Sequence, residues 1–286
     1  MKMNLRGNFM TANRFTYAFI LLAVLITTTA WADVYELAEI LIKAEGQNQP
    51  IPVLSSRYPE LDIETAYEVQ KAYVQKRLVN HKIAGFKAGL TSPEIQKKFG
   101  VEFPVAGVLF ESGRKGDKAV IKTSDFKALT IETEIGFIVG KPITNQIKDI
   151  SELRGYIRAI MPVIELPDLG YEDLKKLKAV DIIASNVSAA QFIVGEEKGL
   201  NALNLNDLTI TLSLDGQVVN QGKGADTLGD QWEAAIWLVN FVINQGWKIE
   251  PGLILITGAM GKMLPGTPGN YVADYGSLGK IRFEIR

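Results

Sequence analysis

The chain has 286 residues, of which 47% are hydrophobic and 22% are charged, proportions that are ordinary for a globular domain of enzyme size. Its formal net charge of −1 gives no electrostatic reason to bind nucleic acid or an anionic membrane. The absence of cysteine excludes disulfide bonds and lipid attachment at a cysteine.

The first 32 residues have the pattern of an export signal. Lys2, Arg6 and Arg14 precede an apolar run over residues 15–26, and Ala30-Trp31-Ala32 forms an Ala-x-Ala cleavage site. The run is shorter than the roughly 20 apolar residues that span a bilayer. We therefore expect residues 1–32 to be a cleaved signal peptide and the protein to be periplasmic or secreted, with an uncleaved anchor as the alternative. Cleavage removes three of 31 basic residues and none of 32 acidic ones, which leaves a net charge of about −4.

Residues 33–286 contain neither a low-complexity linker nor an internal repeat, and they predict a single domain whose first part, residues 33–83, is helical. Apolar residues recur at helical spacing over residues 34–46, and Asp62 can cap a second helix that runs to Leu78. His81 is the only histidine, and we expect it in a solvated loop. A zinc site with several histidines is thereby excluded, and so is any Ser-His-Asp triad without His81.

Lys87 is the first candidate for chemistry. It lies in the run Gly85-Phe-Lys-Ala-Gly-Leu-Thr-Ser, between apolar neighbours that include Leu90. Burial without a partner would lower the pKa of Lys87 toward a range that is useful for acid/base catalysis. The alternative is a surface lysine whose stem covers apolar residues. A short helix between Ser92 and Gly100 should follow, and then short strands over residues 106–110 and 118–122.

Residues 128–140 predict a strand that carries two acidic side chains on one face. Apolar residues alternate along it, and Glu132 and Glu134 share the other face, about 6.6 Å apart at 3.3 Å per residue. Water at an exposed edge would solvate these two charges, or a divalent cation between the two carboxylates would bind both of them. A second apolar run, residues 160–166, contains one charge, Glu165. Because buried carboxylates need a partner, Glu165 lies at an edge, faces a positive group, or shares an ion with Glu132 and Glu134.

The remaining elements in chain order are a short lysine-rich helix over residues 171–178, a polar cluster at Ser185, Asn186 and Ser188, and a hairpin over residues 208–219. A long helix over residues 232–244 should follow the cap at Asp230. A buried strand, residues 253–257, then leads into a glycine-rich run over residues 258–266. That run lacks the spacing of a phosphate-binding loop, so it either presents backbone N–H groups to a ligand carboxylate or is simply a loop. Residues 281–285 alternate as a half-exposed strand.

Five motifs in this order resemble one enzyme family. They are GFKAGLTS from Gly85, GVLF from Gly107, IETEIGFIVG from Ile131, MPVIE from Met161 and ILITGAMG from Ile254. The chain is similar to the 2-keto-4-pentenoate hydratase family, which also contains 4-oxalocrotonate decarboxylase and belongs to the fumarylacetoacetate hydrolase superfamily. The resemblance covers nearly all of residues 33–286.

The resemblance implies an α+β fold, a mixed β-roll with flanking helices, and one hydratase-like catalytic domain. It implies a divalent-metal-dependent lyase of aromatic catabolism that acts on a small 2-oxo acid through a metal-stabilised enolate, with homo-oligomers as the expected assembly. Mg²⁺ or Mn²⁺ would be held by Glu132, Glu134 and Glu165, with Lys87 as the catalytic residue. Substrate contacts are assigned to Leu90, Asn186, Ser188, Thr257 and Gly258.

Two departures from the family pattern keep other functions open. Hydratases typically carry Pro-Asp-Phe-Gly where this chain has Pro104-Val105-Ala106-Gly107, so an expected carboxylate is missing. The usual Ala-Asp-Asn-Ala-Ser is Ala184-Ser185-Asn186-Val187-Ser188. The alternatives are a carbon–carbon hydrolase for acylpyruvate-like substrates and an exported protein that binds an oxo acid without converting it. An export signal is itself unusual, because the pathways that this family serves are cytoplasmic.

Overall fold

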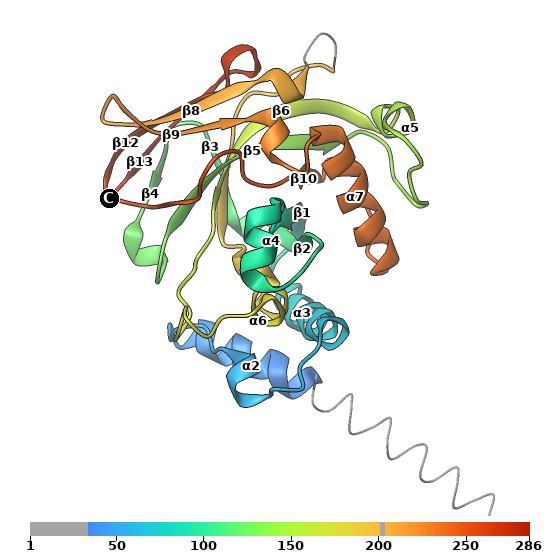
Figure 1. The fold of residues 1–286 in the computed structure, drawn as a ribbon, viewed down its shortest axis with the longest axis vertical. Helices are drawn as coiled ribbons and strands as arrows, with labels where there is room; N and C mark the ends of the chain where they lie inside the picture. Colours follow the sequence, from blue (N-terminus) through green and yellow to red (C-terminus); the bar gives the residue numbers. More distant parts are fainter. Residues whose placement is uncertain (1–33, 201–203) are drawn as a thin grey trace, which may run out of the picture.

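The computed structural model describes residues 34–200 and 204–286, so the predicted signal peptide at residues 1–32 lies outside it. In the described ranges no helix is both long and apolar enough to cross a membrane. Two sheets fill one end of the molecule and continue into its middle, and most of the N-terminal helices gather at the other end (Figure 1).

The larger sheet is mixed and curled, and it carries every predicted charged site residue. Its strands follow the order β2-β1-β10-β5-β6-β7-β3, and β11 adds to one end of β5. The two longest strands, β5 and β6, pair antiparallel, whereas β1 pairs with β10 in parallel. The strands are β1 (Ile83–Gly89), β2 (Val105–Phe110), β3 (Arg114–Gly116), β5 (Thr130–Val139), β6 (Ile157–Leu166), β7 (Gln191–Val194), β10 (Ile254–Ile256) and β11 (Leu264–Pro265).

The second sheet has five strands in the order β4-β13-β12-β8-β9. It contains the predicted hairpin, which turns at Asp215-Gly216, and the predicted C-terminal strand. The strands are β4 (Ala119–Ile121), β8 (Thr209–Leu214), β9 (Gln217–Lys223), β12 (Gly269–Asp274) and β13 (Lys280–Ile285). Together the two sheets and the flanking helices form the predicted α+β fold.

The helices flank the sheets. Residues 34–46 are helical, and they are followed by α2 (Leu54–Arg57) and by α3 (Ile63–Arg77), which Asp62 caps as predicted. The others are α4 (Pro93–Phe99), α5 (Ile150–Arg154), α6 (Ala179–Ala184) and α7 (Gln231–Asn244), and α6 leads into a short turn, η3 (Asn186–Ser188). Helix α3 packs against α6, and α7 packs against β1 and β10.

Two apolar clusters bury the faces of the large sheet. The larger one contains Ile131, Ile135 and Phe137 of β5 together with the buried sides of α3 and α7. The smaller one contains Ile138 of β5 and Val163 of β6. Because side chains alternate along a strand, Ile138 and Val163 share their face with Glu134 and Glu165 respectively. The acidic residues therefore share a face with buried apolar side chains.

The predicted helix over residues 171–178 is wrong. Tyr171 forms a bridge with Ile51, and the carboxylate of Asp173 accepts a hydrogen bond from the Lys175 N–H, which bends the chain into turns. Such local bonds from aspartate to the backbone compete with helix formation. The helix begins only at Ala179.

Candidate metal centre

Strand register places three carboxylates in one cluster. In the antiparallel pair of β5 and β6, Glu132 lies opposite Glu165, and Glu134 lies two residues further along β5 on the same face. One carboxylate oxygen from each residue lies within 4.8 Å of the other two. The structure thus brings together three residues that the sequence separates by up to 33 positions.

Two buried oxygens in this cluster lack a hydrogen-bond partner within residues 34–200 and 204–286. Glu134 and Glu165 are fully buried, and Glu132 is partly buried. Glu134 Oε2 accepts a hydrogen bond from the Gly258 N–H at 2.7 Å, but Glu134 Oε1 and Glu165 Oε2 have no partner among the described residues. Buried carboxylate oxygens are costly to leave unpaired, and hard divalent cations prefer oxygen ligands. The donor set and its unpaired oxygens therefore fit a divalent cation.

Crowding of the acidic groups favours their neutral forms. Burial raises the pKa of Glu132 to about 7, and the nearby charge of Glu165 adds to this effect. Burial, followed by the charges of Glu165 and Glu132, holds the pKa of Glu134 well above its ordinary value. A cation would have to displace these protons, so metal affinity should rise with pH.

Lys87 of β1 supplies a positive charge within the acidic cluster. It is almost fully buried, and its ammonium donates hydrogen bonds to Glu165 Oε1 and, at 3.0 Å, to the carbonyl oxygen of Val187. Burial acts to lower the pKa of Lys87, but the charges of the three glutamates outweigh it and raise the pKa above 10.5. The sequence-based expectation assumed burial without a partner. The partner Glu165, 78 residues away, reverses the direction of the shift.

The raised pKa of Glu132 predicts how the metal-free protein responds to pH. The contribution of Glu132 to the free energy of unfolding should be largest at pH 4.5 and below, and about 3 kcal/mol of it should be lost as pH rises through 7, because the unfolded state releases its proton first. Urea unfolding in a chelator at pH 5 and pH 8 measures this loss. Glu132→Gln should lose less stability than wild type over this range, with the remaining loss coming from other groups such as Glu134, and equal losses in the two proteins would contradict the prediction.

The predicted contacts at Thr257 and Gly258 lie beside the carboxylates, in the turn after β10. Gly258 has φ +115°, and a Cβ there would lie 2.3 Å from Thr91 Oγ1, so only glycine fits. Its N–H is directed at Glu134. The Thr257 hydroxyl bonds to Gln231 Oε1 at 2.5 Å, which orients it toward α7. Leu90, at φ +52°, is half-buried at the end of β1.

Asn186 and Ser188 lie in the turn after α6, with both side chains bonded within the protein. Asn186 exchanges two hydrogen bonds with the backbone of Val108 on β2, at 2.7 and 2.8 Å. The Ser188 hydroxyl lies 2.8 Å from the hydroxyl of Tyr171. The roles of Asn186 and Ser188 as substrate contacts stay predictions.

Val105 begins β2, fully buried, at the position where the family pattern has an aspartate. It pairs with Gly89, two residues from Lys87 along β1. A Cβ on Gly89 would lie 2.7 Å from the side chain of Val187 and 3.4 Å from that of Val105. The space beside Lys87 is therefore filled by two valines where a carboxylate was expected.

Three participants were not predicted from the sequence. Thr91 contacts Gly258, Gln231 holds Thr257, and the carbonyl of Val187 accepts from Lys87. Thr91 lies within the family motif that begins at Gly85, so the sequence did contain a signal that it could belong to the site. Gln231 gave none, because a glutamine at the start of an amphipathic helix is an ordinary residue.

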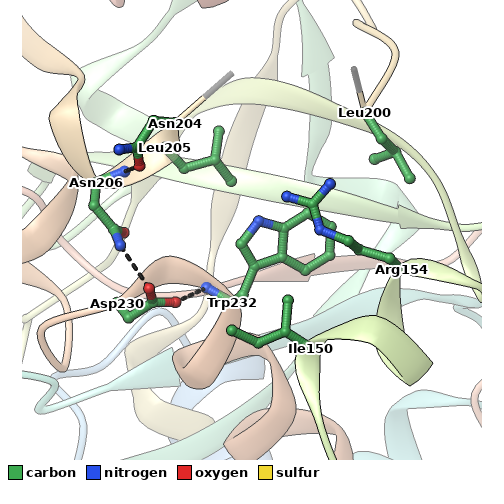
Figure 2. Close-up of a pocket in the computed structure, with 8 residues that line it drawn as sticks. All are labelled: Ile150, Arg154, Leu200, Asn204, Leu205, Asn206, Asp230 and Trp232. Carbon is green, nitrogen blue, oxygen red and sulfur yellow. Dashed lines mark hydrogen bonds between the residues drawn. The ribbon is translucent and has the colours of Figure 1, made fainter. Parts of the chain in front are cut away.

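A separate surface pocket of about 460 Å³ lies at the start of α7 (Figure 2). The Arg154 guanidinium lies 4.5 Å from the centre of the Trp232 ring, and the Asp230 carboxylate accepts a hydrogen bond from Asn206. The residues that line the pocket include none of the predicted site residues.

Comparisons with known proteins agree on one family. The model of the fumarylacetoacetate (FAA) hydrolase C-terminal family matches residues 91–285. The chain is 31% identical to a 2-keto-4-pentenoate hydratase from Paraburkholderia phymatum, covering 86% of this chain and 95% of that protein. It is 30% identical to a 4-oxalocrotonate decarboxylase from Pseudomonas sp. strain CF600, with coverages of 84% and 91%. The structure of 4-oxalocrotonate decarboxylase from Pseudomonas putida G7, complexed with magnesium and adipate, superposes with a TM-score of 0.83 at 28% identity, covering 89% of this chain and 98% of that one.

Proposed function

Because the chain belongs to the fumarylacetoacetate hydrolase C-terminal family, to which its sequence motifs pointed, we propose that it is a divalent-metal-dependent lyase for a small 2-oxo acid. One observation carries this proposal, namely the convergence of Glu132, Glu134 and Glu165. Glu134 Oε1 and Glu165 Oε2 are unpaired among the described residues, and the Lys87 ammonium donates to the other oxygen of Glu165, Oε1. A mixed cluster of this kind is the arrangement that proton transfer next to a cation requires.

The cation we propose is Mg²⁺ or Mn²⁺, held by the three glutamates. Related decarboxylase structures were determined with magnesium and with calcium, and all-oxygen ligand sets suit such ions. When bound, the cation would stabilise negative charge that develops on the oxygen of a 2-oxo acid as it becomes an enolate.

We propose that Lys87 moves the proton. Its ammonium is fixed by Glu165 and by the carbonyl of Val187, and one of its three N–H groups has no acceptor among the described residues. That N–H is available to a substrate carbon or oxygen. Leu90, Ser188, Thr257 and Gly258 remain proposed as residues that shape or position the substrate, whereas the amide of Asn186, which was predicted with them, is already bonded at both ends to Val108.

Hydration and decarboxylation make different demands on this site. Hydration needs a second group that deprotonates water, whereas decarboxylation needs an electron sink and one proton donor. The valines beside Lys87 provide no such second group. Hydration and decarboxylation both remain within the proposal, and the relatives include enzymes of both names.

Val105→Asp tests how much the missing carboxylate limits hydration. We expect it to raise the hydration rate about 10- to 100-fold, because a positioned acid/base group typically contributes 10²- to 10⁴-fold. Product formation from 2-hydroxypenta-2,4-dienoate measures the rate. Val105→Asn has the same shape without the charge and should leave the rate low. If the two variants behave alike, Val105 does not limit hydration.

The substrate class is tested by product analysis with purified protein and Mg²⁺ or Mn²⁺. Decarboxylase or hydratase activity should appear with 4-oxalocrotonate or 2-hydroxypenta-2,4-dienoate, and a chelator should abolish it. Turnover of acylpyruvates alone would replace the lyase with the carbon–carbon hydrolase. Thermal stabilisation by an oxo acid without any product would identify a binding protein. The relatives named above favour neither of these two alternatives.

We also propose that the chain is exported with cleavage before Asp33 and that it forms homo-oligomers. The basic and apolar pattern of residues 1–32 supports export. Mass spectrometry of the protein from a periplasmic fraction would give its N-terminus, and light scattering would give its oligomeric state. An N-terminus at Met1 in the cytoplasmic fraction would contradict export.

A further inference from the structure

The segment that holds the Lys87 ammonium has an unusual backbone. Asn186, Val187 and Ser188 have φ values of +58°, +53° and +55°, which place three consecutive residues other than glycine in the left-handed region. This conformation is unfavourable for such residues, and most of all for a β-branched valine. It persists only where surrounding contacts fix it, and such residues cluster at functional sites.

The side chain of Asn186 makes hydrogen bonds that hold this backbone conformation in place. It is 1% exposed, its Oδ1 accepts from the Val108 N–H, and its Nδ2 donates to the Val108 carbonyl. Strand β2 is at the end of the strand order in its sheet, so these two groups of Val108 have no neighbouring strand to pair with. The amide of Asn186 takes the place of that strand and attaches the turn to β2.

Two glycines let the turn approach the sheet. A Cβ on Gly107 would lie 2.9 Å from the Asn186 carbonyl oxygen and 3.1 Å from Val187 Cβ, and Gly89 has a similar contact with the Val187 side chain. Gly107 is the cross-strand partner of Lys87. This close approach puts the Val187 carbonyl 3.0 Å from Lys87 Nζ.

We propose that Asn186 is a positioning residue, which acts by holding the Val187 carbonyl against the Lys87 ammonium and does not contact the substrate. With both polar ends of its amide bonded to Val108, Asn186 has its main hydrogen-bonding capacity used within the protein. Ser188, through Tyr171, fixes the other end of the turn. The effect of Asn186 on turnover depends on the proposed function, whereas its effect on the orientation of Lys87 does not.

The chain contains a matched control for these two hydrogen bonds. Asn240 of α7 also accepts from one residue's N–H and donates to the same residue's carbonyl, here Ile147, at 2.7 and 2.9 Å. Asn240→Ala therefore removes the same pair of bonds from a place that does not contact Lys87. A comparable loss of stability in both variants is expected, so stability alone cannot distinguish them.

The distinguishing measurement is the ¹⁵N NMR signal of the Lys87 ammonium, assigned with Lys87→Met and recorded with and without Mg²⁺. Exchange of its protons with water should be at least about tenfold faster in Asn186→Ala than in wild type, because a buried acceptor is displaced. It should be unchanged in Asn240→Ala. Unchanged exchange in Asn186→Ala would overturn the proposal, whether or not an oxo acid is turned over.

Kinetics give the second measurement where turnover is found. Asn186→Ala should lower kcat about 10- to 100-fold, as expected for a misplaced catalytic group, while KM and the metal Kd change less than about twofold. A rise in KM with unchanged kcat would instead make Asn186 a substrate contact.

If Asn186→Ala does not fold, Asn186→Asp keeps the acceptor for the Val108 N–H and loses the donor. In Asn186→Asp, exchange of the Lys87 ammonium protons that is faster than in wild type supports the proposal, and an exchange rate equal to that of wild type refutes it.

Discussion

Glu134→Gln should abolish the stabilisation of this protein by Mg²⁺ or Mn²⁺ while leaving the metal-free fold intact. Glutamine keeps an oxygen that can accept from the Gly258 N–H, and it replaces the unpaired Oε1 with an NH₂ group that cannot bind a cation. The metal-free protein should tolerate the change, because burial and neighbouring charges raise the pKa of Glu134 and already favour its neutral form.

The expected size of the effect follows from the role of a direct ligand. Changes to residues that only support metal ligands cost 10- to 100-fold in affinity, so loss of Glu134 should cost at least about 100-fold. At a metal concentration of about 100 times the Kd, wild type gains about 2.7 kcal/mol. In a domain of this size that gain raises Tm by roughly 5–10 °C, whereas a variant with 100-fold weaker affinity gains only about 0.4 kcal/mol, a rise of at most about 1–2 °C.

Thermal unfolding with and without metal, together with calorimetric titration, measures both quantities. Glu197→Gln is the matched control, because Glu197 is exposed and pairs with Arg158 at the surface. It should bind metal as wild type does. Equal metal affinity in Glu134→Gln and wild type would refute the ligand role.

The acidic cluster was predictable as a possibility, because the alternation in residues 128–140 and the isolated charge in residues 160–166 are local signals. Its assembly was not predictable from those signals. The register that sets Glu132 opposite Glu165 depends on how β5 and β6 pair, and shifting a strand by one residue would turn the side chains to the other face. The family resemblance supplied that information.

Predictions failed where a partner distant in sequence decides the outcome. The direction of the pKa shift of Lys87 reversed because Glu165 lies beside it, and no pattern around residue 87 encodes that neighbour. The helix expected at residues 171–178 is absent because Tyr171 bridges to Ile51 and Asp173 bonds to the local backbone. Single-segment propensity is a weak guide when such contacts compete with it.

The polar cluster at Ser185, Asn186 and Ser188 was visible in the sequence, but its conformation was not. Neither asparagine nor valine signals three residues at positive φ, which require the edge of β2 and the glycines opposite. The hairpin at Asp215-Gly216 and the cap at Asp230 were predictable, because their turn and capping chemistry is contained within a few residues.

Lys87→Met should lower turnover by at least about 10³-fold without weakening metal binding. Methionine fills a similar volume but cannot carry a proton, and a general acid/base group contributes 10²- to 10⁴-fold. Removal of the ammonium also removes a positive charge that competes for Glu165, so the metal Kd should stay the same or fall. A variant that lost activity because it had unfolded would lose metal binding as well.

The metal-free form of Lys87→Met should be less stable, because Glu165 then loses its buried partner, and removal of one member of a buried ion pair can cost 3–5 kcal/mol. Metal should restore part of this loss, because a cation neutralises the same carboxylates. Turnover, metal titration and thermal unfolding are to be compared with Lys82→Met, which removes an exposed lysine next to β1. Full turnover by Lys87→Met would remove Lys87 from the reaction. A loss of metal affinity equal to that of Glu134→Gln would instead show that Lys87 organises the carboxylates and does not move the proton.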